Sequence, residues 1–131
     1  MLGDEPELRL DPASYRRFDA VTAAIASLDV PSAVAAYRRL EPLCERSYRA
    51  LGYPEGGFEA RLRAALTLLL VTPPATPSPA LVAETLRYEF ADPALERLTD
   101  AQKLLLRMGP ENGERVRAKL REIETALGSP R

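Results

Sequence analysis

Apolar residues recur every three or four positions through most of this chain, which is the spacing of one face of an α-helix. Proline stands just inside the start of several predicted helices and glycine just past the end, the order that helix termini favour. Asp11-Pro12 begins the first helix, with Asp11 as its N-cap. Further helices are predicted from near Pro31 to Gly52, from about Gly57 to Val71, from Thr99 to near Met108 and from Pro110 to about Leu127, with a short helical turn at Asp92-Pro93.

The same spacing predicts which side of each helix is buried. We expect Pro42 to kink the second helix, because it has no amide to bond the carbonyl of Arg38. The last turn of the third helix, residues 68–71, is apolar on every side, which predicts that this helix is the central one. The expected buried residues are Phe18, Val21, Ile25 and Leu28; Tyr37, Leu40, Cys44, Tyr48 and Leu51; Phe58, Leu62, Ala65, Leu66 and Leu69; and Val116, Leu120, Ile123 and Leu127.

Residues 72–90 do not continue the helical pattern. The run "TPPATPSP", residues 72–79, predicts an extended connector, because proline cannot continue a helix. Residues 81–90 carry two apolar patterns. Val82, Leu86 and Phe90 are four residues apart, as on one face of a helix, whereas Leu86, Tyr88 and Phe90 alternate with charged residues, as in a strand. We favour the extended form, with residues 8–10 as the segment that would pair with it.

The predicted fold is therefore all-α, or mainly α if residues 81–90 are extended. At 131 residues the chain has the length of one domain. We expect a single-domain helical bundle of about five helices over residues 11–128, ending in a helical hairpin around Gly109-Pro110. Residues 1–10 are predicted to be an N-terminal tail or a short extended segment.

Composition removes several kinds of chemistry. The formal charge is −1, which argues against a general binder of polyanions. There is no histidine and only one cysteine, Cys44, so the sequence offers neither the usual general base nor a zinc site. Glu41 and Glu45 lie one turn apart, but Arg38 and Arg49 flank them and predict an ion-pair ladder instead of an acid/base pair. We expect no enzymatic activity, no metal and no cofactor.

The stretch "KLLLRMGPENGERVRAKLREI", residues 103–123, resembles half of a helix-hairpin-helix motif that binds a nucleic-acid backbone. Gly109 matches the second glycine of that turn, whereas Arg107 replaces the first, which such a turn needs for close approach to a phosphate. Arg115 and Lys119 lie on one side of the apolar stripe of the last helix, and Arg117 and Arg121 lie on the other. This placement predicts charged side chains at the rim of a core. Nucleic-acid contact through Arg107, Gly109, Arg115 and Lys119 is the alternative.

A second candidate site is the turn between the second and third helices. Tyr53 and Phe58 bracket its Gly56-Gly57 pair. Two aromatic side chains beside a glycine turn fit two roles: they either plug the end of the core or form an exposed aromatic loop that a partner binds. Tyr53, Gly56 and Phe58 are thus the candidate partner-binding loop.

Two longer stretches, "YRRLEPLCERSYRALGYPEGGF" (residues 37–58) and "YEFADPALERLTDAQKLLLRMGPENGERVRAKLREI" (residues 88–123), resemble an uncharacterised bacterial family, domain of unknown function 3014. The resemblance runs from near Leu10 to about Leu127. It implies that the chain corresponds to the C-terminal portion of longer proteins, which have an N-terminal membrane anchor, a proline-rich linker and a soluble part facing the envelope. It implies no activity, substrate or catalytic residue.

From these observations we expect a non-enzymatic protein-interaction or scaffolding module of a bacterial envelope protein. The resemblance implies the periplasmic side of the inner membrane. The expected partner is another protein or a second copy. The start "MLGDEPEL" has the character of neither a signal peptide nor a membrane span, so contact with a membrane is expected only through an anchor that this sequence lacks. A nucleic-acid-binding domain using residues 103–123 is the alternative function.

Overall fold

The computed structural model describes residues 8–53, 57–75, 79–83 and 88–128. The fold is mainly α-helical, as the sequence predicts. In chain order the elements are the 3₁₀ helix η1 (Pro12–Phe18), α1 (Asp19–Ala26), α2 (Val30–Ala50), α3 (Gly57–Leu70), β1 (Leu81–Ala83), β2 (Tyr88–Phe90), α4 (Pro93–Glu96), α5 (Asp100–Arg107) and α6 (Pro110–Leu127).

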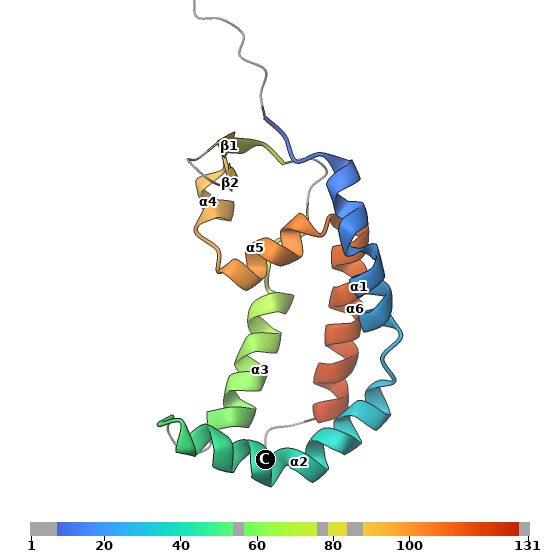
Figure 1. The fold of residues 1–131 in the computed structure, drawn as a ribbon, viewed down its shortest axis with the longest axis vertical. Coiled ribbons are helices and arrows are strands. Elements are labelled where there is room, and N and C mark those ends of the chain that lie inside the picture. The colour runs from blue at the N-terminus through green and yellow to red at the C-terminus, as the bar shows by residue number, and fades with distance from the viewer. Residues whose placement is uncertain (1–7, 54–56, 76–78, 84–87, 129–131) are drawn as a thin grey trace, which may run out of the picture.

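The long helices form a frame (Figure 1). α3 and α6 are its two sides, α2 crosses the base and contacts both, and α5 crosses near the other end. α1 lies along α6. The short strands and α4 project beyond α5, at the end opposite α2. α6 is contacted by α1, α2, α3 and α5, whereas the outer side of α2 faces away from the other described helices.

Local sequence signals fix most helix ends. The side chains of Asp11 and Asp92 each accept a hydrogen bond from the amide two residues on, at 2.9 Å, and a proline follows each cap. Thr99 and Gln102 form the predicted capping box at the start of α5. The first predicted helix differs in one respect, because its opening turns are 3₁₀ before α1 begins at Asp19.

The extended form that we favour for residues 81–90 is confirmed at residues 81–83 and 88–90, whereas residues 84–87 lie outside the described residues. β1 and β2 pair antiparallel, with Leu81 opposite Phe90. Arg9 bridges to Ala80, so the segment at residues 8–10 lies beside the start of β1 as predicted. Backbone pairing thus decides a choice that the apolar pattern leaves open.

The core lies where α5 meets α6. Leu105, Met108 and Val116 form its buried cluster. The half-buried side chains of Phe18, Ile25, Leu69 and Leu120 pack around that cluster. The predicted stripe of α6 is confirmed, since Val116 and Leu127 are buried and Leu120 and Ile123 are half-buried.

Several predicted burial assignments are wrong. Val21 in α1 and Leu28 just after it are 50% and 42% exposed, and Thr22 is the fully buried residue of α1 instead. In α2, Leu40 and Leu51 are exposed, although Tyr37, Cys44 and Tyr48 are half-buried as expected. In α3, Ala65 and Leu68 are exposed, and so is Val71 just after the helix, so α3 is not enclosed on all sides. These side chains are exposed because the frame is open, so neighbouring helices cover only part of each helix surface.

Candidate functional site

The α5–α6 turn is packed against the N-terminal segment. Gly109 has a positive φ of 91°, and the ring of Tyr15 lies so close that a Cβ on this glycine would sit 2.6 Å from ring atoms. The amide of Gly109 donates to the carbonyl of Leu106 at 3.2 Å. The backbone that a helix-hairpin-helix would offer to a phosphate is therefore covered and already bonded.

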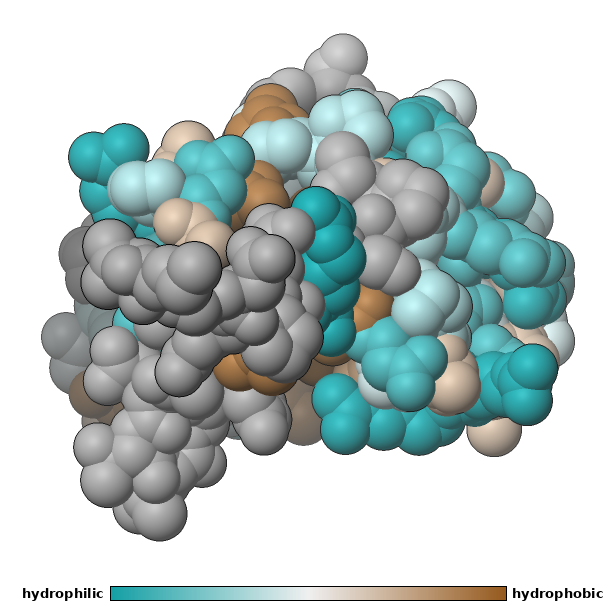
Figure 2. Space-filling model, turned by 90° about the horizontal axis from the view of Figure 1, so that it is seen from above, coloured by the Kyte–Doolittle hydropathy of each residue, from teal (hydrophilic) through white to brown (hydrophobic). Residues whose placement is uncertain are grey.

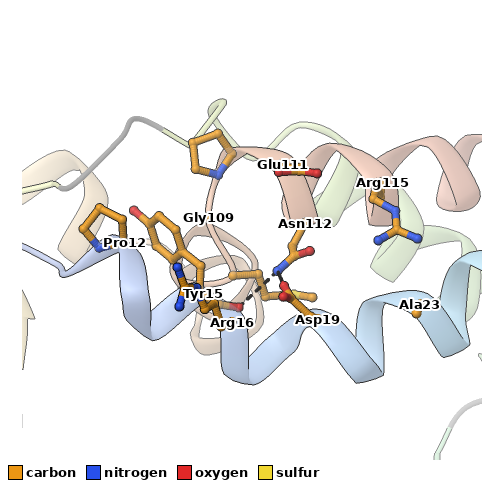
Figure 3. A pocket seen from close by; sticks show the side chains of 11 residues that line it. Pro12, Tyr15, Arg16, Asp19, Ala23, Gly109, Glu111, Asn112 and Arg115 are labelled. Carbon is orange, nitrogen blue, oxygen red and sulfur yellow. Dashed lines mark hydrogen bonds between the residues drawn. The ribbon is translucent and has the colours of Figure 1, made fainter.

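A cavity of about 620 Å³ lies beside this turn (Figure 3). The buried side chain of Asn112 joins its two walls, donating to the carbonyl of Tyr15 at 3.1 Å and to Oδ1 of Asp19 at 2.9 Å. Arg16 and Arg115 contribute positive charge to the lining, and Asp19 and Glu111 contribute negative charge. The cavity walls thus carry balanced charge.

The predicted nucleic-acid residues have separate surroundings. The guanidinium carbon of Arg107 lies 5.1 Å from the ring centroid of Phe90. The ammonium of Lys119 donates to the carbonyl of Leu28 at 3.0 Å, and Arg115 lines the cavity beside the turn. With Gly109 buried, these groups do not present one exposed cationic surface.

Arg117 contradicts the prediction that the charged side chains of α6 lie at the rim of the core, because it is only 6% exposed. Its guanidinium donates to the carbonyls of Thr72 and Pro73, at 2.6 and 2.7 Å, and so fixes the connector to α6. Burial lowers the pKa of Arg117 by desolvation. A proline-rich segment supplies carbonyl acceptors but few amide donors, and that shortage is the sequence signal that a donor must come from elsewhere.

The predicted aromatic loop is part of a ring cluster between α2 and α3. Tyr53 stacks on Tyr48 with centroids 4.4 Å apart, and it is 52% exposed. Phe58 is half-buried, with its ring 6.1 Å from that of Tyr37 and 6.0 Å from that of Tyr48. Gly56 lies outside the described residues. Phe58 thus fits the plug, whereas Tyr53 remains accessible.

The inner side of α2 is polar and bonded to other helix ends. The carboxylate of Glu45 accepts from the amides of Phe58 and Glu59, at 3.4 and 3.1 Å, and so caps the start of α3. The predicted pair of Arg38 and Glu41 is present at 3.1 Å. However, the predicted ladder is incomplete, because Glu45 is used by α3.

Arg38 extends this network to α6. It also pairs with Glu59, and that hydrogen bond raises the pKa of the Arg38 guanidinium. Its second nitrogen donates to the carbonyl of Leu127 at 3.0 Å, and Arg63 donates to the carbonyl of Gly128 at 2.7 Å. Cations at the last carbonyls of a helix are favourable. Polar contacts thus join α2, α3 and the end of α6.

The outer side of α2 has the opposite character. Leu40, Leu43 and Leu51 are 53%, 54% and 75% exposed. We define the outer face of α2 as these leucines together with the exposed residues between and beside them. The remaining members are Ala36, Ser47 and Ala50, with the arginines Arg39, Arg46 and Arg49 along one flank.

Sequence reasoning missed this face because it placed Leu40 and Leu51 inside. A helical wheel alone shows an apolar arc, but it does not tell whether another helix covers that arc. The available signal was the position of the glutamates. Glu41 and Glu45 lie on the side of α2 that also carries Tyr37 and Tyr48, so the covered side is the mixed one.

Among the described residues, no group of three or more acidic or cysteine side chains is placed to hold a metal ion. No single described helix combines the length and apolar composition of a membrane span. Residues 12–26 and 30–50 satisfy those criteria only together, as a pair bent by 73°.

Comparisons with known proteins give one match. No curated protein and no solved structure matches the chain. One family model matches residues 2–124, which is nearly the whole sequence. The chain therefore belongs to the family described as "Protein of unknown function (DUF3014)".

Proposed function

We propose that this chain is a non-enzymatic interaction or scaffolding module of a bacterial envelope protein, and that it docks through the outer face of α2. The observation that carries the proposal is the exposure of Leu40 and Leu43 along one side of α2 and of Leu51 at its C-cap. Isolated exposed leucines are ordinary on a protein surface, but a continuous apolar stripe favours an interaction site.

The inner side of α2 supports this assignment. Its contacts to α3 and α6 already use Glu45 and Arg38. α2 therefore does not need its leucines to hold its place in the frame, and burying them against a partner would remove apolar area from water. Each leucine side chain contributes about 2 kcal/mol when it is fully buried.

The envelope location rests on the resemblance of residues 37–58 and 88–123 described above. The nucleic-acid alternative has less support, because Gly109 is covered by Tyr15, Lys119 bonds to the carbonyl of Leu28 and Arg107 lies over the ring of Phe90.

Fractionation of cells that make this 131-residue chain tests the proposal. We expect the wild type in a high-mass or particulate fraction and the Leu40→Ser/Leu43→Ser variant as a free monomer. Leu104→Ser/Val71→Ser is the matched control, since these two residues are 52% and 67% exposed but lie outside α2. A wild type that is already a free monomer, or a control that shifts equally, would contradict the proposal.

A further inference from the structure

We propose that the partner of the outer face of α2 is the surface of a lipid bilayer containing anionic lipids. The inference rests on the proposed function, since it names the partner of the same face. The inference goes beyond the proposed function because α2 itself would contact the membrane. The argument uses the distribution of charge over α2, the shape of the helix and the chemistry of the exposed side chains.

The acidic and the exposed basic side chains of α2 lie on different sides of the helix. Both glutamates of the helix face inward, where Glu41 pairs with Arg38 and Glu45 accepts from the amides that begin α3. Three arginines, Arg39, Arg46 and Arg49, are exposed. The outward part of α2 therefore carries cations and no carboxylate of its own helix.

The apolar and cationic groups also occupy adjoining strips. At 100° per residue, the residues from Ala36 to Leu51 that form the apolar strip span an arc of about 100°. Arg39 and Arg46 lie about 20° and 40° beyond one edge of that arc, and Arg49 lies about 100° beyond the same edge, towards Glu45. An interfacial helix on a bilayer has this arrangement, with leucines at the acyl boundary and guanidinium groups at the phosphates.

The form of α2 suits a flat surface. Pro42 lies inside the helix between Leu40 and Leu43. Figure 1 shows α2 bowed, with its convex side turned away from the other helices. A convex ridge can meet a bilayer without a matching groove, whereas a protein partner would need a concave site.

The end of the molecule opposite α2 lacks a comparable apolar strip on its described surface. Figure 2 views the end opposite α2, where hydrophilic residues dominate the described surface and apolar ones show only as small separate areas. The inner side of α2 remains bonded to α3 and α6 through Glu45 and Arg38. α2 would thus lie on the bilayer surface and not cross it.

Other occupants fit less well. A second copy docked antiparallel would bring the two arginine flanks together with no carboxylate of α2 between them. A nucleic acid would satisfy the arginines but would leave Leu40 and Leu43 against a charged backbone. An anionic bilayer takes both kinds of side chain at once.

The test is binding of the full chain to vesicles of phosphatidylcholine alone and of phosphatidylcholine with about one-third phosphatidylglycerol, measured by flotation. We expect binding to the anionic vesicles, weakened by salt. Each arginine near an anionic surface contributes about fivefold, so Arg39→Gln/Arg46→Gln/Arg49→Gln should lower the partition coefficient about 100-fold. Leu40→Ser/Leu43→Ser should lower it at least about tenfold.

A charge-matched control separates a local face from overall charge. Arg61→Gln/Arg97→Gln/Arg115→Gln removes three other exposed arginines and should change the partition less than about threefold. Equal losses in the two triple variants would overturn the proposal. So would a wild type that binds no anionic vesicles at low salt, or one that binds labelled DNA and not vesicles.

The two proposals fail separately. If vesicles are not bound but the α2 leucine variant still leaves the high-mass fraction of cells, the lipid inference is wrong and a protein occupies the outer face of α2. If the wild type is a free monomer in cells and also binds no vesicles, both proposals are wrong.

Discussion

The α5–α6 end of the molecule and α2 at its base arrange polar and apolar side chains in opposite ways. At the α5–α6 end, Leu105 and Met108 are inside, each 6% exposed or less. At the base, Glu45 and Arg38 point inward to other helix ends, while Leu43 is 54% exposed.

This difference teaches how each region gets its stability. The α5–α6 end is held by apolar burial and close packing around Gly109. α2 is held by the aromatic ring cluster that it shares with α3 and by hydrogen bonds to the ends of α3 and α6, which leaves its apolar arc available. An apolar arc that the fold does not use is the feature on which both proposals rest.

The largest expected effect comes from a leucine pair that contrasts the two regions. Leu105→Ala should lower the free energy of unfolding by about 3 kcal/mol, because it leaves a cavity in the buried cluster. Leu43→Ala should lower it by less than about 0.5 kcal/mol, because that side chain is half in water. Urea unfolding of both variants measures the contrast, and equal losses would show that the outer face of α2 is covered.

A second contrast uses arginines of α6. Arg117→Met should cost about 2.5 kcal/mol, because the carbonyls of Thr72 and Pro73 lose a charged donor. Arg121→Met, at a side chain 55% exposed, should change stability by less than about 0.5 kcal/mol. Thermal and urea unfolding check the pair. A neutral Arg117→Met would mean that the desolvation of this cation offsets its hydrogen bonds.

Two glycines with positive φ allow a sharper comparison of packing. Gly109→Ala should cost about 2 kcal/mol, since the new Cβ adds a clash with Tyr15 to the backbone strain. Gly52→Ala, after the end of α2, has a similar φ of 93° but nothing within 4 Å, so only about 1 kcal/mol of strain is expected. Equal costs in urea unfolding would mean that Tyr15 moves aside without loss.

The smallest expected effect concerns pH near α4. Hydrogen bonds from Lys103 and from the amide of Phe90 lower the pKa of Glu96 below its usual 4.5. A lowered folded-state pKa adds stability that is present above the unfolded value and is lost as pH falls through the folded value. The stability advantage of wild type over Glu96→Gln should therefore shrink between pH 6 and pH 3. An advantage that does not change with pH would contradict this role.

Helix positions were largely predictable because they depend on neighbours in the sequence. Asp92 before Pro93, the Thr99–Gln102 capping box and Gly128 after α6 each act within four residues. The buried face of α6 was also predictable, since the neighbouring helices cover the apolar stripe that the sequence shows. The 3₁₀ start of the first helix was not, because cap and proline signals do not distinguish the two helix types.

The candidate sites were less predictable. The sequence indicated Arg107, Gly109, Arg115 and Lys119 by their motif, but their surroundings come from Tyr15, Phe90 and Leu28, which are distant in the chain. It also assigned Leu40 and Leu51 to the core, since an amphipathic pattern shows that a helix has two sides and not which side meets a neighbour.

The sequence by itself determined that this protein is mainly helical, where its helices begin and end, and which family it resembles, because caps, prolines and motifs are local. Only the tertiary structure decided that Arg117 is buried, that Thr22 replaces Val21 inside, and that α2 turns its glutamates inward. The physical reason is that burial depends on which helices approach in space. In this fold α2 meets the ends of α3 and α6, so Arg38 and Glu45 bond to those ends inside and the leucines of α2 remain outside.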